Sequence, residues 1–311
     1  MKLCHFNMLI CFSSLIKEPV ILQEALWLLL FPRGMIFVSS LLLSVDLEDV
    51  RDWVKDGACY REGVQENTRI YLQQFKKWGV KATFFVVGEV ARRYPQLIGE
   101  IIEAGHELAC HGDVHLQLDK LSAKEFHIDI QRNLAALKAA GGEKIVGFRA
   151  PTFSLTARSA WAHEVLADLG FTYSSSVLPA KNPLYGWPEF GKEAKKVAGS
   201  LWELPVSLYE IPGLPVPMAG GVYFRVLPFF LSKWAIGQSI GKKQPVVTYF
   251  HPYDIDTKQE RFMHPDIGGK NYLNMLMYIG RAKVLNRLDM LHQLFPFQAY
   301  GDYVNHLQTK G

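Results

Sequence analysis

Four short polar segments of this 311-residue chain contain the side chains best suited to catalysis. They are Asp46-Leu47-Glu48-Asp49, His111-Gly112-Asp113-Val114-His115, Arg149-Ala150-Pro151 and His251-Pro252. Two imidazoles and a carboxylate are a common ligand set for an open divalent metal site, and acids and histidines also transfer protons. Each segment alone has a structural alternative, because acids cap helices, arginines form ion pairs and histidines satisfy buried hydrogen bonds. Their positions in the fold therefore decide between the two interpretations.

Each of the four segments follows a predicted buried strand. Hydrophobic patterning predicts strands over residues 37–46, 82–87, 107–110, 145–148, 171–175 and 245–250, and helices over 67–78, 89–104, 123–140, 157–169 and 271–294. Alternating strands and helices are typical of βαβ units on parallel strands, closed as a barrel or open as a wound sheet. In both architectures the loops after the strands meet at one rim, so we expect the four segments to lie together.

The rest of the chain is organised around these strands. Residues 178–221 are rich in proline and predict an insertion or loop-rich cap, in which the aromatic ring of Trp187 either stacks on a ligand or packs within the cap. Charged residues break every apolar run in residues 1–35 before the ~18 residues of a membrane span, so we predict no integral membrane segment. We interpret residues 1–35 as a leader or non-core extension, 36–300 as a single catalytic domain with a C-terminal extension over 252–300, and 301–311 as a tail.

Composition excludes several classes of protein. The chain has 34 basic and 30 acidic residues, a formal charge of +4, so nucleic acid is not an expected partner. Hydrophobic residues make up 49% and charged residues 21%, which is the balance of a folded globular protein. The four cysteines form no CxxC pair, so neither a disulfide scaffold nor a thiolate zinc site is predicted.

In their order and spacing, the four segments resemble the motifs of polysaccharide deacetylases with NodB homology, carbohydrate esterase family 4. The matching stretches are SVDLED, ELACHGDVH, FRAP and TYFHP. Five more are similar to the subgroup found in bacterial exopolysaccharide loci, including exosortase-associated ones: YSSSVLP, WELPVS, GGVYFRVLP, HPYDID and the helix over Tyr272–Phe297. The resemblance covers nearly all of residues 36–300. It implies an α/β fold, a distorted (β/α) barrel of NodB-homology type with a loop-rich C-terminal extension.

The resemblance also implies a hydrolase that removes the N-acetyl group of a sugar in a bacterial exopolysaccharide or its precursor. One divalent metal, with zinc expected, would strengthen the water nucleophile and polarise the carbonyl. His111 and His115 would be metal ligands together with one carboxylate of the first motif. Asp46 would be the general base, Arg149 would hold Asp46 ionised, and His251 would protonate the departing amine. The predicted substrate-binding residues are Pro151, Tyr173 and Trp187.

Two positions depart from the family pattern. Leu47 follows Asp46 where many members have a second aspartate, so the third ligand is Glu48 or Asp49. Side chains alternate along a strand, which places Glu48 on the side of Asp46 and favours it, with Asp49 as the alternative. Ser174 stands where the subgroup usually has aspartate, which affects either substrate contacts or activity.

Two other functions stay open at this point. One is hydrolysis of a different amide or a cyclic ureide by the same superfamily, and the other is a catalytically inactive carbohydrate-binding barrel, suggested by Ser174 and the altered first motif. Substrate trials separate the first from a deacetylase, and metal content separates the second. We expect a carbohydrate partner and a cytoplasmic location, with membrane association as the alternative, while the oligomeric state is open.

Overall fold

The computed structural model describes residues 39–181, 185–211, 214–267 and 269–310. The predicted leader over residues 1–35 lies outside these residues. Among the described residues, no helix is both long and apolar enough to cross a bilayer. The cytoplasmic location stays a prediction.

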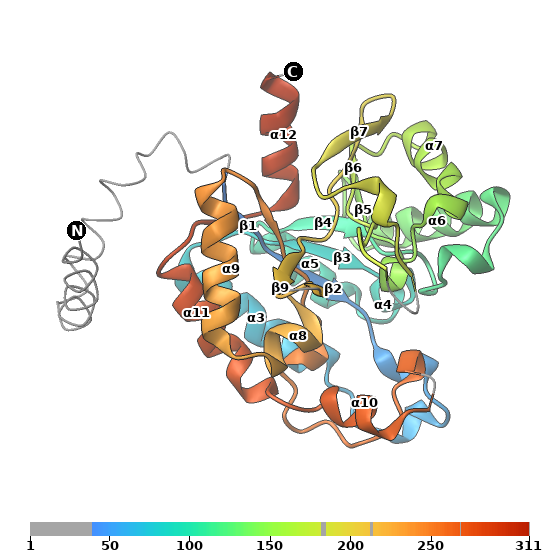
Figure 1. The fold of residues 1–311 in the computed structure, drawn as a ribbon. Helices are drawn as coiled ribbons and strands as arrows, with labels where there is room; N and C mark the ends of the chain where they lie inside the picture. The colour runs from blue at the N-terminus through green and yellow to red at the C-terminus, as the bar shows by residue number, and fades with distance from the viewer. Residues whose placement is uncertain (1–38, 182–184, 212–213, 268, 311) are drawn as a thin grey trace, which may run out of the picture.

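A curved sheet forms the centre of the molecule (Figure 1). Its order is β2 (Ser44–Leu47), β3 (Thr83–Val86), β4 (Glu107–Cys110), β5 (Gly147–Phe148), β6 (Tyr173–Ser174), β8 (Leu201–Glu203) and β7 (Lys195–Ala198). Every neighbouring pair is parallel except β7 and β8. Parallel strands buried on both faces require crossover helices, so the predicted α/β class is confirmed.

A smaller sheet completes the first strand. It contains β11 (Val246–Val247), β1 (Leu41–Leu42) and β12 (Phe297–Gln298), and only Leu43 separates β1 from β2. The chain after β11 continues along β2, where Asp46 N donates to Phe250 O at 2.7 Å. Between β11 and the chain after β8, Val247 N donates to the hydroxyl of Ser207 at 2.9 Å. The strands therefore curve into a distorted barrel, and a serine side chain bridges β11 to the chain after β8.

Helices surround the barrel (Figure 1). They are α3 (Val64–Trp78), α4 (Gly88–Arg93), α5 (Pro95–Glu103), α6 (Ala123–Ala139), α7 (Trp161–Asp168), α8 (Gly221–Val226), α9 (Phe229–Gly241), α10 (Asn271–Leu276), α11 (Val284–His292) and α12 (Tyr300–Lys310). In α3, Val64, Tyr71 and Phe75 recur on one face and are buried, as an amphipathic pattern predicts. These helices leave the strand ends free to position polar residues.

Two predicted helices are each broken in the structure. The helix predicted over 89–104 is α4 and α5, because Pro95 has no N–H to continue the ladder and instead begins α5. The helix predicted over 271–294 is α10 and α11, separated at Gly280, which has a left-handed φ of 77°.

Two predicted boundaries were also wrong. The segment 178–221 is more than a loop-rich cap, because β7 and β8 within it extend the main sheet, and β9 (Tyr209–Ile211) pairs with β10 (Leu214–Val216) in an antiparallel hairpin. The predicted tail after residue 300 is mostly helix α12, and its first side chain, Tyr300, is fully buried. The C-terminal helix therefore belongs to the core of the molecule.

Candidate active site

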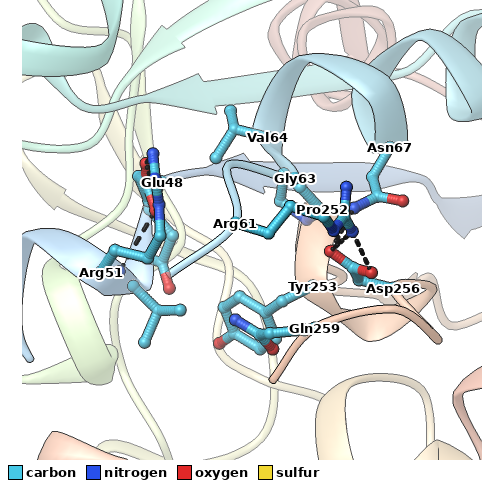
Figure 2. A pocket seen from close by; sticks show the side chains of 12 residues that line it. Glu48, Arg51, Arg61, Gly63, Val64, Asn67, Pro252, Tyr253, Asp256 and Gln259 are labelled. Atoms are coloured by element: carbon cyan, nitrogen blue, oxygen red, sulfur yellow. Dashed lines mark hydrogen bonds and ion pairs between the residues drawn. The ribbon is translucent and has the colours of Figure 1, made fainter. Parts of the chain in front are cut away.

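The acidic segment after β2 points its carboxylates in different directions. Asp49 caps the following helical turn by accepting from Arg51 N at 3.1 Å, and its carboxylate pairs with the Arg51 guanidinium at 2.5 Å. Glu48 is buried and forms the wall of a small cavity beside Arg51, Arg61 and Tyr253 (Figure 2). Glu48 is therefore available for the predicted metal, whereas the carboxylate of Asp49 is already engaged.

Glu48 meets both histidines of the second segment. Donor atoms of Glu48, His111 and His115 all lie within 4.8 Å of one another, and all three side chains are buried. Nε2 of His115 lies 2.8 Å and Nε2 of His111 3.4 Å from Oε2 of Glu48. Two imidazoles and one carboxylate with converging donors fit an open divalent site of the kind zinc prefers.

Hydrogen bonding selects the tautomer of His111 that a metal needs. Its Nδ1 lies 2.8 Å from the carbonyl oxygen of Arg149. Because a carbonyl only accepts, Nδ1 carries a proton, which leaves Nε2, on the side of Glu48, as the ring nitrogen that would bind a metal. This support comes from the residue after β5, so two of the four sequence segments are coupled directly.

The second histidine is held by its backbone and by an aromatic ring. His115 has a left-handed φ of 56°, which is costly for a residue with a Cβ. The Trp53 ring stacks on its imidazole with centroids 4.0 Å apart. The preceding loop is fixed by Asn133, whose amide donates to Gly112 O at 2.6 Å and Val86 O at 2.8 Å. The backbone strain and the contacts that offset it are therefore found at His115, a candidate metal ligand.

Glu48 is ionised in this setting. Burial raises the pKa of its carboxyl, but the nearby imidazoles of His115 and His251 and hydrogen bonds from His111 and His115 lower it well below the usual range. The result is a buried negative charge surrounded by imidazole nitrogens, which is the electrostatic character of a cation site.

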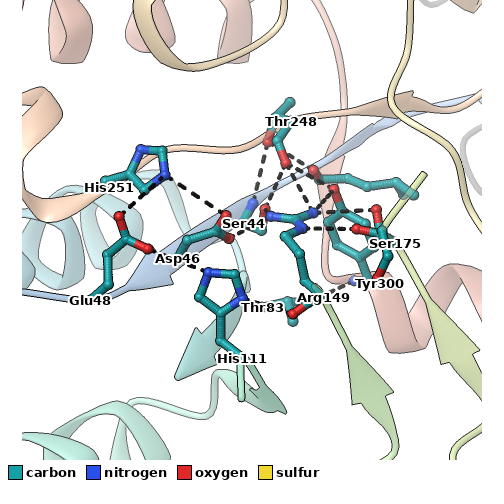
Figure 3. Close-up of polar contacts among 12 residues, drawn as sticks. Ser44, Asp46, Glu48, Thr83, His111, Arg149, Ser175, Thr248, His251 and Tyr300 are labelled. Atoms are coloured by element: carbon teal, nitrogen blue, oxygen red, sulfur yellow. Dashed lines mark hydrogen bonds and ion pairs between the residues drawn. The ribbon is translucent and has the colours of Figure 1, made fainter. Parts of the chain in front are cut away.

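Asp46 forms a buried ion pair with Arg149 (Figure 3). Nη1 of Arg149 donates to Oδ1 of Asp46 at 2.5 Å and to the Ser44 hydroxyl at 2.8 Å. The Arg149 guanidinium is fully buried and lies over the Phe85 ring at 4.0 Å. Oδ2 of Asp46 is 3.9 Å from Nε2 of His251, so this second oxygen faces the site.

His251 approaches the cluster from the chain after β11, which runs alongside β2. Its Nδ1 donates to Oδ2 of Asp254 at 2.9 Å, while its Nε2 lies 3.9 Å from both Asp46 and Glu48. Burial lowers the pKa of His251, but the carboxylates of Glu48, Asp254 and Asp46 outweigh it and raise that pKa to about 9. The imidazole is therefore protonated at neutral pH and presents Nε2–H to the site.

Three polar residues around these groups were not predicted. Asp254 holds His251, Arg225 of α8 pairs with Asp254 at 2.9 Å, and Tyr300 bonds to Arg149. The spacing of His251 and Asp254 is a signal for the first, since a carboxylate three residues later can reach back across one helical turn. Arg225 and Tyr300 carry no local signal, because their partners are distant in the sequence.

Tyr300 joins the C-terminal helix to the site (Figure 3). Its hydroxyl accepts from Nη2 of Arg149 at 2.7 Å and donates to Thr248 O at 2.8 Å. The other contacts of this Nη2, to the Ser175 hydroxyl and Thr248 O, are longer at 3.4 and 3.5 Å. Tyr300 is thus the strongest partner of that end of the guanidinium.

The predicted substrate-binding residues differ in their placement. Pro151 is buried beside Gly112 in the loop after β5, next to the candidate ligands. Tyr173 does not fit a substrate contact, because it is fully buried and its hydroxyl donates to Glu107 at 2.8 Å. Trp187 lies with Tyr185 in a separate groove of about 710 Å³ lined by residues around Asp119 and Thr156.

Ser174, the second departure from the family pattern, lies outside the catalytic cluster. It is fully buried, and its hydroxyl donates to the Ser176 hydroxyl at 2.8 Å. Ser176 in turn accepts from Ala150 N at 2.8 Å. Serine at this position therefore helps to support the loop that follows Arg149.

Comparisons with known proteins divide the chain into two parts. Residues 56–174 match the polysaccharide deacetylase family, and residues 175–305 match a domain of unknown function, DUF3473. Residues 56–174 therefore form a region of the polysaccharide deacetylase type. The DUF3473 region follows it directly and contains His251, Asp254 and Tyr300.

Individual relatives agree with this assignment. The chain is 25% identical over 198 residues to a peptidoglycan deacetylase-like protein of Gibberella zeae, and 28% identical over 107 residues to the peptidoglycan deacetylase of Helicobacter pylori. These matches cover 56% and 34% of this chain, and 56% and 36% of the two relatives. The match to a bifunctional xylanase/deacetylase of Pseudobutyrivibrio xylanivorans has 30% identity and covers 31% of this chain and 16% of that protein.

One solved structure supports the fold along most of the chain. It is a candidate polysaccharide deacetylase from Mycobacterium smegmatis, with a TM-score of 0.60 and 20% sequence identity. The similarity covers 90% of this chain and 93% of that one, so the two share the fold of both regions.

The first prediction concerns the third ligand. Glu48→Gln should lower zinc affinity at least about 100-fold, above the range that outer-shell partners of a metal give. The matched control Asp49→Asn should change it less than about tenfold, because Asp49 is engaged by Arg51. Zinc titration with a competing chelator measures both, and a larger loss in Asp49→Asn would reverse the ligand assignment.

The second prediction concerns Tyr300. Tyr300→Phe should lower kcat for acetate release about tenfold, the value of about one net hydrogen bond to a charged group, with little change in KM or zinc content. Tyr303→Phe is the matched control, since Tyr303 is also buried on α12 but its hydroxyl lies outside the contacts of Arg149. If Tyr300→Phe and Tyr303→Phe had the same kcat, the hydroxyl of Tyr300 would make no contribution to the reaction.

Proposed function

We propose that this protein hydrolyses the N-acetyl amide of a sugar residue with the help of a divalent metal, with zinc as the expected ion. The proposal rests on three groups of side chains that lie together in one buried site. They are a possible metal site of Glu48, His111 and His115, a carboxylate, Asp46, held by Arg149, and an imidazole, His251, held by Asp254. Relatives named peptidoglycan and chitin deacetylases support the same chemistry.

The candidate ligands would hold the metal through one carboxylate oxygen and two imidazole Nε2 atoms. A bound zinc supplies a more acidic water and a Lewis acid for the acetyl carbonyl. The chain itself contributes a buried, ionised Glu48 and a His111 ring oriented by the carbonyl of Arg149, and a bound metal would take the place of the imidazole protons that face Glu48.

Asp46 is placed to act as the general base. Arg149 takes one carboxylate oxygen, which leaves Oδ2 to accept the proton of the attacking water. Because the Arg149 guanidinium is bonded on several sides, the Asp46 carboxylate keeps one orientation throughout the reaction.

His251 is placed to act as the general acid. Amide cleavage requires a proton on the leaving nitrogen, and the Nε2–H of His251 faces Asp46 and Glu48 across the site. The carboxylates of Asp254 and Asp46 both favour the protonated ring of His251. Asp254, itself paired with Arg225, fixes the ring so that Nε2 points inward.

We propose an acetylated bacterial exopolysaccharide or its precursor as the substrate. One feature supports this choice over cell-wall polymers, namely the sequence stretches similar to the exopolysaccharide-associated subgroup. The groove beside Trp187 and Tyr185 is a candidate for neighbouring sugars of a chain.

The experiment that tests the function is acetate release from N-acetylated oligosaccharides before and after metal removal. The wild-type protein should release acetate, lose that activity with a chelator and regain it with zinc. A cyclic ureide cleaved in preference to sugars would favour the alternative hydrolase. Absence of tight zinc binding, together with no hydrolysis of any acetylated sugar, would favour the inactive carbohydrate-binding barrel.

A further prediction separates the acid from the base. His251→Ala should lower kcat on an N-acetyl amide by about 10²–10⁴-fold, but much less on an activated aryl acetate whose leaving group needs no proton. Asp46→Asn should impair both substrates, because water must be activated in each case. Both variants should keep their zinc, and a His251→Ala variant equally impaired on amide and ester would contradict the assigned role.

A further inference from the structure

Two consecutive helices of the DUF3473 region expose large apolar side chains. Tyr223 and Val226 of α8 are 39% and 38% exposed, and Phe230 and Trp234 of α9 are 66% and 59% exposed. Only Leu227 and Pro228 separate the two helices. Both lie on the outside of the molecule, far from α6 and α7 (Figure 1). We refer to these four side chains as the α8–α9 face.

The sequence that forms this face carries charge of one sign. Residues 211–253 contain no aspartate or glutamate, although they contain Arg225, Lys233, Lys242 and Lys243. Arg225 is buried against Asp254, but the three lysines are exposed. Lys233 lies directly before Trp234 on α9. Aromatic side chains beside lysines, without acids, are complementary to an anionic lipid surface, where rings enter the headgroup layer and lysines meet phosphates.

The same helices are connected to the active site. Gly221 N, at the start of α8, donates to Tyr249 O at 3.0 Å, two residues before His251. Arg225, on the inward side of α8, pairs with the Asp254 that holds His251. A surface bound to the outward side of α8 is therefore separated from the general acid by one helix.

We propose that the α8–α9 face binds the surface of an anionic bilayer, so that the protein is peripherally attached with this side of the barrel against the lipid. The attachment does not depend on the proposed deacetylation, although it fits a substrate that is itself carried on a membrane. Exposed aromatic residues contribute most of the affinity, and the lysines make it depend on lipid charge and salt.

The test is co-sedimentation of the full chain with vesicles of phosphatidylcholine alone or mixed with phosphatidylglycerol, without substrate. Wild-type protein should bind the mixed vesicles more tightly, and added salt should weaken that binding. The double variant Phe230→Ser/Trp234→Ser should lose about tenfold or more in affinity, because two aromatic side chains no longer enter the interface. Lys233→Glu should lose about fivefold or more on anionic vesicles only.

Tyr272→Ser provides the matched control. Tyr272 on α10 is 64% exposed, and it lies outside the α8–α9 face, so its removal should leave vesicle binding unchanged. The thermal unfolding midpoint of each variant should match that of the wild type. Absence of wild-type binding, or equal binding by the double variant, would overturn the proposal. If the wild-type protein does not bind vesicles and the double variant has a different oligomeric state in light scattering, the α8–α9 face is a protein interface and the proposal is wrong.

Discussion

The structure depends most on one buried ion pair, between Arg149 and Asp46. Removing two charges from water is costly, and the pair is tolerated only if the remaining donors and acceptors are satisfied. Here Arg149 also donates to Ser44, Ser175 and Tyr300, and its guanidinium lies 4.0 Å from the centre of the Phe85 ring. These partners come from strands around the whole barrel and from the last helix.

This arrangement explains why the two matched regions form one site. Arg149 belongs to the deacetylase domain, whereas Thr248, His251 and Tyr300 belong to the DUF3473 region. The carbonyl of Arg149 fixes the tautomer of His111, and its side chain fixes Asp46. A candidate metal ligand and the candidate base are thus positioned by one residue, which the C-terminal region holds in place. The DUF3473 region therefore completes the deacetylase barrel.

The sequence indicates which candidate site residues lie together because their positions follow from local rules. Strand periodicity identifies β2 to β6, and alternation along β2 favours Glu48 over Asp49, in agreement with the observed directions of the two carboxylates. The same rule does not show which face of β6 is inward, and Tyr173, predicted to touch substrate, is a core residue bonded to Glu107.

Contacts made by residues outside the recognised motifs were beyond prediction. Tyr300 reaches Arg149 across 151 positions, and a short apolar-polar mixture after residue 300 gives no sign that it forms a buried helix start. The strands β7 and β8 were hidden by the prolines around them, because their pairing with β6 is set by the sheet and not by local propensity.

The central claim is that Glu48, His111 and His115 form a metal site beside Asp46. Crystals of the zinc-loaded protein, measured on both sides of the zinc absorption edge, test it most directly. The account predicts one anomalous peak within bonding distance of a Glu48 carboxylate oxygen and of Nε2 in both histidines, with Asp46 still paired to Arg149. A peak bonded to Asp46 or Asp49, or no peak at these three residues, would contradict it.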